Sequence, residues 1–258
     1  MEIAQKFNPK TFAALFDHTL LRADATPQQI SALCAEAVQL GCATVCVNPV
    51  NLPVAVRDLE GSPVLPITVV GFPLGAVPVS WKAEETRRAV DMGAQEIDMV
   101  MNVGLFLSGS LASPASGPET ARGLHDEVSA VVAAAGDVPV KVIIETALLT
   151  PDLTRHAARI CAEAGAAFVK TSTGFSTRGA SIEDLVCMFA GIQEAKKSMS
   201  QGAIHTRIKA SGGIRSLDQV LAMIGAGAHR IGSSNTVAIM SDFTKWYNAQ
   251  NLNNLNNK

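Results

Sequence analysis

The sequence predicts a single (β/α)8 barrel, the TIM-barrel architecture, preceded by one extra N-terminal helix. The chain has 258 residues, of which 48% are hydrophobic, and barrels of this type commonly use roughly 250 residues as one domain. Eight short apolar segments alternate with helical segments, which indicates βαβ units and a parallel sheet. An open, doubly wound sheet is the alternative, but no GxGxxG follows the first expected strand.

The expected strands are short, apolar, and bounded by residues that favour turns. They cover Phe16–Leu21, Ala43–Val47, Pro66–Phe72, Glu96–Met101, Val140–Glu145, Ala167–Lys170, Thr206–Ala210 and Ala228–Gly232. Because the active sites of such barrels lie at the C-terminal ends of the strands, the residues at those ends are the candidates for function.

The expected helices follow from capping residues and helix-ending glycines. Thr26 and Pro27 supply the N-cap and first position of one helix, and Gly41 ends it. Caps are also expected at Ser80, Thr150, Ser181 and Ser216, and the helices themselves at residues 9–16, 27–40, 50–59, 81–92, 118–136, 151–164, 182–198, 216–224 and 235–247. Residues 107–117 are expected to form a long loop or insertion, and residues 248–258 a flexible tail.

Composition excludes several classes of function. The net charge of -2 favours neither nucleic acid nor an anionic membrane surface. Five cysteines without a CxxC pair indicate neither a disulfide framework nor a zinc site, and reduced thiols are typical of the cytosol. The first ten residues lack the apolar core of a signal peptide, and no apolar stretch is long enough for a membrane span. We therefore expect a cytoplasmic protein.

Ionisable and polar residues gather at the expected C-terminal ends of the strands. They are Asp17, Thr19, Cys46, Asp98, Lys141, Glu145, Lys170 and Lys209. Charged groups that face one barrel mouth perturb one another's pKa values, which is typical of functional sites. Lys170 follows the apolar pair Phe168-Val169, and a lysine held neutral is the nucleophile of Schiff-base chemistry with carbonyl compounds. A second ammonium nearby, such as that of Lys209, would lower its pKa.

Each of these residues also has a purely structural interpretation. Lys170 could place its ammonium in solvent at a strand end. Asp98 could shuttle a proton with Lys209 as its partner, or the two could form a structural ion pair. Lys141 could join a network inside the barrel or point outward, and Cys46 could lie beside a substrate or be a small buried side chain. The residues alone leave these alternatives open.

A second group of candidates consists of glycines and serines in loops. Ser211-Gly212-Gly213 follows the seventh expected strand, and Gly232-Ser233-Ser234 follows the eighth. These two loops commonly form a phosphate site in (β/α)8 barrels, because glycine lets backbone N–H groups approach an anion. Thr173 and Gly174 could add to this site. Ordinary turn chemistry explains any one glycine, but less readily both loops.

Five motifs taken together resemble one known family. They are Asp17-His18-Thr19-Leu20-Leu21, Glu96-Ile97-Asp98-Met99-Val100, Lys141-Val142-Ile143-Ile144-Glu145-Thr146, Lys170-Thr171-Ser172-Thr173-Gly174-Phe175 and Lys209-Ala210-Ser211-Gly212-Gly213-Ile214-Arg215. In this order the chain resembles the 2-deoxyribose-5-phosphate aldolases. The resemblance implies a class I aldolase on a (β/α)8 barrel. Such an enzyme reversibly cleaves 2-deoxy-D-ribose 5-phosphate to D-glyceraldehyde 3-phosphate and acetaldehyde, without a metal or other cofactor.

The resemblance also implies roles for the candidates. Lys170 would form the Schiff base, Lys209 would lower its pKa, and Asp98 would relay protons. Supporting residues would be Asp17, Thr19, Lys141 and Cys46, and the phosphate would be held by Thr173, Gly174, Gly212, Gly213, Ser233 and Ser234. The implied partners are the small-molecule sugar phosphate and acetaldehyde, and further copies of the chain in a homodimer or homotetramer.

The chain departs from the family pattern in three places. Residues 107–117 form a longer segment than expected, Arg178 replaces a small residue near the expected phosphate site, and the chain ends in Asn-Asn-Lys where some members end in a tyrosine. Two other functions compete with this one. One is a Schiff-base barrel aldolase for a different phosphorylated aldol, and the other is a non-catalytic sugar-phosphate sensor.

Overall fold

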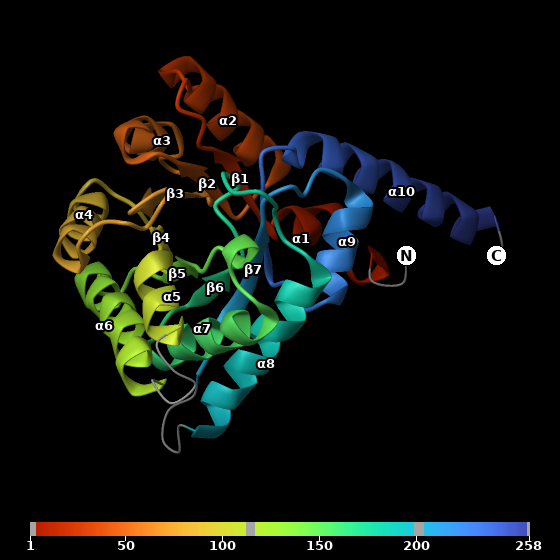
Figure 1. The fold of residues 1–258 in the computed structure, drawn as a ribbon. Helices are drawn as coiled ribbons and strands as arrows, with labels where there is room; N and C mark the ends of the chain where they lie inside the picture. The colour runs from red at the N-terminus through yellow and green to blue at the C-terminus, as the bar shows by residue number, and fades with distance from the viewer. Residues whose placement is uncertain (1–3, 112–116, 199–203, 257–258) are drawn as a thin grey trace.

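The computed structural model describes residues 4–111, 117–198 and 204–256, and it contains a closed parallel barrel with the strand order β1 to β8 (Figure 1). The predicted (β/α)8 barrel is therefore confirmed. The strands are β1 Phe16–Leu20, β2 Thr44–Val47, β3 Leu65–Val70, β4 Glu96–Val100, β5 Val140–Ile143, β6 Phe168–Lys170, β7 Arg207–Ser211 and β8 Arg230–Ser233.

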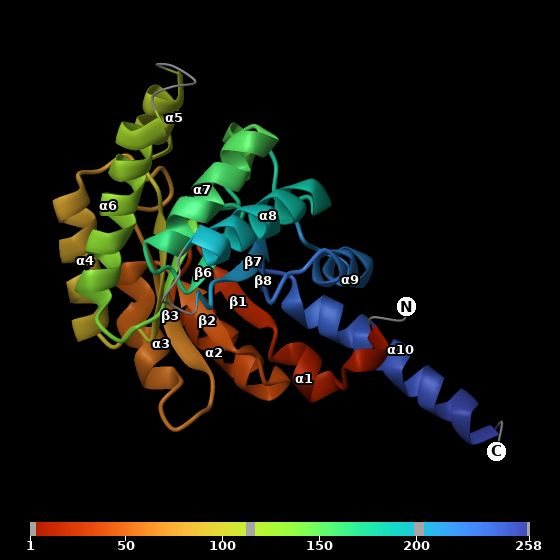
Figure 2. The same cartoon turned by 90° about the horizontal axis from the view of Figure 1, so that it is seen from below.

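Helices surround the barrel and connect its strands (Figures 1 and 2). The α-helices are α1 Pro9–Ala13, α2 Pro27–Leu40, α3 Leu52–Asp58, α4 Val79–Asp91, α5 Val103–Leu111, α6 Gly117–Ala135, α7 Pro151–Glu163, α8 Ile182–Ser198, α9 Leu217–Gly225 and α10 Thr236–Asn256. Short 3-10 helices are η1 Ala4–Lys6, η2 Pro49–Asn51 and η3 Thr146–Leu148. The expected extra N-terminal helix is α1, where Phe12 stacks on Phe243 of α10 with ring centroids 3.9 Å apart.

The strand register brings the candidate residues together. Asp98 of β4 is paired with Lys141 of β5, and Lys170 of β6 with Lys209 of β7. Alternate residues such as Met99 point outward into the apolar layer under the helices. The ionisable side chains therefore share the barrel interior, while the hydrophobic core lies between the barrel and its helices.

Most predicted caps are confirmed, and one is wrong. Thr26 and Ser216 each form a capping box, and Thr150 accepts a hydrogen bond from the N–H of Leu153. Helix α4, however, begins at Val79 directly after Pro78, so Ser80 lies inside its first turn. Proline suits that boundary because the first residues of a helix need no intrahelical donor.

Two segments expected to be irregular are partly helical. Residues 107–111 of the expected loop belong to α5, residues 112–116 lie outside the described residues, and α6 begins at Gly117. Phe106 is buried, so packing of an apolar face outweighs the small residues that suggested a loop. In the expected flexible tail, residues 248–256 continue α10, which extends beyond the side of the barrel (Figure 2). Residues 257–258 lie outside the described part.

The described part of the chain contains no disulfide and no helix of membrane-spanning character. All five cysteines are free, and four of them are buried. Among the described residues, no helix is long and apolar enough to cross a membrane.

Candidate active site

Asp98 lies at the centre of a buried ionic cluster inside the barrel. Its Oδ2 atom is 2.7 Å from Nζ of Lys170 and 2.6 Å from Nζ of Lys209, and its Oδ1 atom is 2.7 Å from Nζ of Lys141. All four side chains are almost completely buried. One carboxylate therefore joins three lysines, and the two lysines of the expected catalytic pair contact the same oxygen atom.

A second layer of charge lies next to this centre. Oδ2 of Asp17 is 2.5 Å from Nζ of Lys209 and 3.3 Å from Nζ of Lys141. Oδ1 of Asp17 accepts a 2.6 Å hydrogen bond from Arg230, and Glu96 is 2.7 Å from Lys141 and 3.3 Å from Arg230. Asp17 and Lys141 therefore lie inside the barrel, so of the two alternatives for Lys141 the structure has the one in which it joins a network there.

The charges of this cluster favour a neutral Lys170. The carboxylates are Asp17, Glu96 and Asp98, and the cationic side chains are Lys141, Lys170, Lys209 and Arg230. Three negative charges can balance only three positive charges. Because an unbalanced charge in a buried site is costly, the fourth cationic group is favoured in its neutral form.

The directions of the pKa shifts indicate which cationic group is the least stable in its charged form. Burial lowers the pKa of Lys170; the carboxylate of Asp98 opposes this shift and the ammonium of Lys209 reinforces it. Burial alone would also lower the pKa of Lys209, but the carboxylates of Asp17 and Asp98 outweigh it, and the pKa is raised. The pKa of Lys141 is raised for the same reason. For Asp98, burial would raise the pKa, but the three lysines hold it well below the usual value.

Lys170 is the one lysine of the cluster that opens into a cleft at the C-terminal ends of the strands. This cleft has a volume of about 340 Å³. Its lining includes Lys170 and seven other predicted site residues: Thr19, Thr173, Gly174, Gly212, Gly213, Ser233 and Ser234. Asp17, Asp98, Lys141 and Lys209 lie below this opening and do not line it. Lys170 therefore joins the buried cluster to the space that a substrate can enter.

Two of the supporting candidates, Thr19 and Cys46, offer no free side-chain donor to the cleft. The hydroxyl of Thr19 lines the cleft but donates to the backbone oxygen of Asp17 at 2.8 Å. Cys46 is fully buried among Leu21, Ile67 and Val69 and does not line the cleft. Burial raises the pKa of its thiol to about 11. Cys46 is thus placed as a small, uncharged side chain beneath the site.

The glycine loops that line the cleft are rich in unused backbone donors. In the described part of the chain, the N–H groups of Gly174, Gly212, Gly213 and Ser234 donate to no other residue. The φ angles of the three glycines are 88°, 85° and 72°, which lie in the left-handed region that glycine adopts without steric cost. Ser234 also precedes the N-terminus of α10, whose dipole favours an anion. Free donors of this kind are suited to a phosphate group.

The loop after β6 and the loop after β7 contact each other closely. The carbonyl of Gly212 accepts from the N–H of Ala180 at 3.2 Å. A Cβ atom on Gly179 would lie 1.9 Å from that same carbonyl oxygen. Only glycine at this position allows the loop after β6 to pack so closely on the loop after β7.

Arg178 is directed away from the free donors of the glycine loops. Its guanidinium pairs with Asp184 at 2.5 and 2.9 Å and donates to the backbone oxygen of Thr146 at 3.0 Å. Asp184 also accepts from the hydroxyl of Thr146. The arginine that replaces a small residue therefore connects the loop after β5 to the start of α8.

Three charged residues of the site were not among the candidates that the sequence analysis named. Glu96 and Arg230 belong to the buried cluster, and Arg215 lines the cleft beside the glycine loops without an ion pair to another described residue. A charged residue inside an expected buried strand was the available signal for Glu96 and Arg230. Arg215 gave no comparable signal, because an arginine in a loop is usually only solvated.

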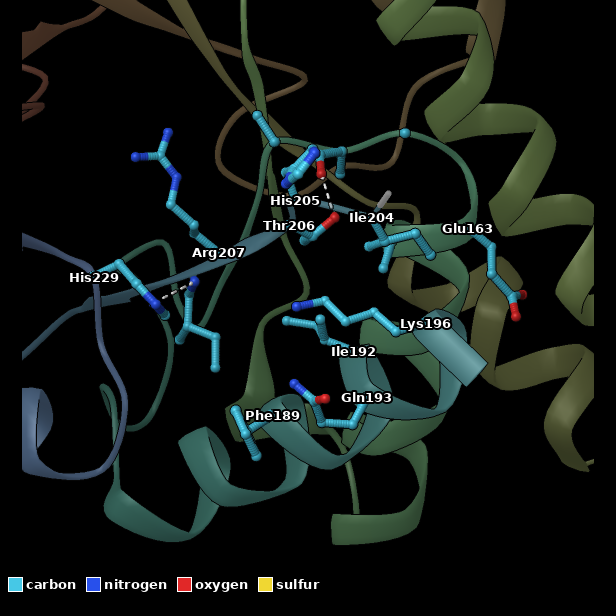
Figure 3. Close-up of a pocket in the computed structure, with 15 residues that line it drawn as sticks. Glu163, Phe189, Ile192, Gln193, Lys196, Ile204, His205, Thr206, Arg207 and His229 are labelled. Atoms are coloured by element: carbon cyan, nitrogen blue, oxygen red, sulfur yellow. Dashed lines mark hydrogen bonds between the residues drawn. The ribbon is translucent and has the colours of Figure 1, made fainter. Parts of the chain in front are cut away.

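A second hollow, of about 840 Å³, lies at the opposite, N-terminal ends of β6 to β8 (Figure 3). Figure 3 shows the amine of Lys196 pointing into it and the carboxylate of Glu163 pointing away. Glu163 instead accepts from Arg159 at 2.9 Å. The hollow shares no lining residue with the cleft at Lys170, and active sites of this fold lie on the other face.

The fold and the cleft define an enzyme of the (β/α)8-barrel class, with a buried lysine at the C-terminal mouth of the barrel. Within this class, the chain belongs to the DeoC/LacD family of aldolases, whose sequence model matches residues 11–239.

Relatives with known names agree with this family. The deoxyribose-phosphate aldolase of Coprothermobacter proteolyticus is 45% identical over 228 residues, which cover 88% of this chain and 95% of that protein. The enzyme of the same name from Streptococcus gordonii is 46% identical over 88% of this chain and 94% of that protein. Among solved structures, the tetrameric deoxyribose phosphate aldolase of Aeropyrum pernix has a TM-score of 0.78 and 28% identity, covering 94% of this chain and 95% of that one.

Proposed function

We propose that this chain is a class I aldolase that reversibly cleaves 2-deoxy-D-ribose 5-phosphate to D-glyceraldehyde 3-phosphate and acetaldehyde. The observation that carries the proposal is the position of Lys170, which contacts Asp98 on one side and lines the cleft on the other. The aldolase family of the chain and the names of its relatives support the same substrate.

The first step is nucleophilic attack by Lys170. Its neutral Nζ adds to the aldehyde carbon of the open-chain sugar to form a carbinolamine. Uptake of one proton and loss of water then leave a protonated imine. Neighbouring Lys209 keeps its own proton because Asp17 and Asp98 raise its pKa. The charge of Lys209 therefore persists beside Lys170 and favours the free amine that this step requires.

The protonated imine then acts as an electron sink. As the hydroxyl at C3 of the sugar loses its proton, the bond between C2 and C3 breaks and its electron pair forms an enamine. D-glyceraldehyde 3-phosphate leaves, the enamine is protonated at C2, and hydrolysis releases acetaldehyde and restores Lys170. We assign the proton transfers to Asp98, which is ionised at rest and lies 2.7 Å from Lys170 and 2.6 Å from Lys209.

The phosphate orients the sugar in this scheme. The free N–H groups of Gly174, Gly212, Gly213 and Ser234 would hold its oxygens, and Arg215 lines the same cleft. Lys170 also lines this cleft. The distance between these donors and the amine would place the aldehyde carbon, and not another carbon of the sugar, against Lys170.

Covalent trapping tests the proposal. Sodium borohydride with acetaldehyde should reduce the imine and label one peptide, the one that contains Lys170. A Lys170→Leu variant should not be labelled, and normal labelling of that variant would contradict the assignment. Comparing turnover of 2-deoxyribose 5-phosphate with that of other phosphorylated aldols separates this function from a related aldolase. Binding without any turnover would indicate a sensor.

We also propose a cytoplasmic location and assembly into a homodimer or homotetramer. Buried, unpaired thiols suit a reducing compartment. The outer face of α8 exposes Ile182, Val186 and Phe189 at helical spacing, which supports contact with another copy of the chain. Light scattering in solution should give two or four times the mass of 27.0 kDa, and a monomer would contradict the assembly.

A further inference from the structure

Glu145 occupies an unusual backbone position directly after β5. Its φ and ψ angles are 52° and 66°, and it is the only residue other than glycine with positive φ in the described part of the chain. The N–H groups on either side of it, from Ile144 and Thr146, donate to consecutive residues, Lys170 and Thr171. Glu145 is therefore an extra residue in the register between β5 and the chain after β6, as in a β-bulge.

The left-handed backbone costs free energy, so neighbouring contacts must hold it. A Cβ atom makes this conformation sterically unfavourable, so residues other than glycine adopt it rarely. The backbone oxygen of Glu145 accepts from Leu148, and Thr146 is held by Asp184 and by Arg178. These contacts fix the direction in which the side chain of Glu145 leaves the strand. Bulges beside active sites often redirect a side chain in this way.

The side chain of Glu145 binds Thr173. Its carboxyl group is buried, and Oε2 accepts the N–H of Thr173 at 3.2 Å together with a very short hydrogen bond from the hydroxyl. The oxygen of that hydroxyl accepts the N–H of Phe175 at 3.1 Å. Glu145 itself does not line the cleft.

This arrangement leaves Thr173 without a free donor. Its N–H and its hydroxyl proton both go to Glu145. Phosphate oxygens are acceptors and need donors, so Thr173 is unsuited to bind them. The next residue, Gly174, has a free N–H that lines the cleft. Thr173 thus supports the donor of Gly174 instead of acting as a donor itself.

We propose that Glu145 is a positioning residue for the phosphate end of the cleft. By binding both donors of Thr173, it fixes the turn that presents the N–H of Gly174, and it acts on the substrate only through that turn. This role rests on the proposed function, since it concerns the phosphate of the sugar. It changes the assignment of Thr173 from a phosphate ligand to part of the supporting framework.

The experiment compares Glu145→Ala with Glu145→Gln, using 2-deoxyribose 5-phosphate and unphosphorylated 2-deoxyribose as substrates. Alanine removes the acceptor, and we expect KM for the phosphorylated sugar to rise about tenfold, the effect of about 1.4 kcal/mol. We expect kcat, the kinetics with 2-deoxyribose, and borohydride trapping with acetaldehyde to change less than about twofold. Glutamine retains an acceptor oxygen and should restore KM to within about threefold of wild type.

A double-mutant cycle tests whether Glu145 acts through Thr173. Thr173→Val should raise the same KM about tenfold, and Glu145→Ala combined with Thr173→Val should raise it no further. Additive effects would overturn the proposal, as would equal losses with both substrates. If Glu145→Ala does not fold, the other two variants test the proposal. A normal KM in Thr173→Val would overturn the proposal, and so would a tenfold rise of KM in Glu145→Gln. If instead the proposed function is wrong, the wild-type protein itself will show neither borohydride trapping with acetaldehyde nor turnover of 2-deoxyribose 5-phosphate.

Discussion

Two buried lysines with lowered pKa values have different surroundings in this protein. Lys82 of α4 lies outside the barrel, fully buried, 2.5 Å from Glu127 of α6 and 2.7 Å from the backbone oxygen of Val100. Burial lowers its pKa, although Glu127 opposes the shift. Lys170 lies inside the barrel, and burial lowers its pKa as well.

The difference lies in the partners and in access. Lys82 has a carboxylate of its own, and the other oxygen of Glu127 accepts the N–H of Asn102, so this pair fastens α4 and α6 to the end of β4. Lys170 shares one carboxylate oxygen with Lys209 and lines a cleft. A lowered pKa alone therefore does not distinguish a nucleophile from a structural lysine. The role that we propose for Lys170 rests also on its shared carboxylate and on its access to the cleft.

The largest effect is expected for Lys170→Met. Loss of the nucleophile should lower kcat/KM by at least about 10³-fold. The melting temperature should stay equal or rise, because a desolvated amine is replaced by an apolar chain and Asp98 keeps Lys141 and Lys209 as partners. Enzyme assays and calorimetry measure both quantities. A stable variant with more than about a tenth of wild-type activity would remove Lys170 from the mechanism.

Lys82→Met should give the reverse result. It leaves the buried carboxylate of Glu127 without its cation, so the free energy of unfolding should fall by about 3–5 kcal/mol. Trapping at Lys170 should persist in the folded protein. Adding Glu127→Leu should recover most of the stability. Denaturant unfolding of wild type and of these two variants checks this, and a Lys82→Met protein as stable as wild type would contradict it.

Lys209→Met tests how the cluster controls the charge of Lys170. Without the neighbouring ammonium, the charged form of Lys170 is less disfavoured, so its pKa should rise. Less free amine is then present at neutral pH, and the rate of trapping with acetaldehyde should fall on the order of tenfold at pH 7. The rate should recover as the pH is raised. A pH profile of the same shape and midpoint as wild type would show that Lys209 does not tune Lys170.

The smallest effect is expected at an exposed ion pair. Arg88 and Glu84 on α4 lie 2.9 Å apart but remain largely in solvent. Water and salt screen such pairs, so Arg88→Ala should leave the melting temperature and kcat/KM unchanged within experimental error. A clear loss of stability would mean that burial does not account for the contrast between this pair and the pair of Lys82 and Glu127.

The sequence was most informative where local rules decide. Alternating apolar segments, capping residues such as Thr26 and Ser216, and helix-ending glycines predicted the barrel and most element boundaries. Strand ends then marked Lys170, Lys209 and Asp98 as candidates, because parallel strands bring their C-terminal ends to one face. Local rules failed at residues 107–111, which continue a helix whose buried apolar side chains, Val103 and Phe106, lie before them.

Only the tertiary structure decided how charges and donors are shared. The sequence does not show that Lys170 and Lys209 compete for one oxygen of Asp98, or that Glu96 and Arg230 belong to the same buried cluster. These contacts join residues from several strands, and their energies depend on burial and on distances of a few ångströms. The chain by itself therefore determines which side chains reach the mouth of the barrel. The packed barrel determines which of them keeps its proton.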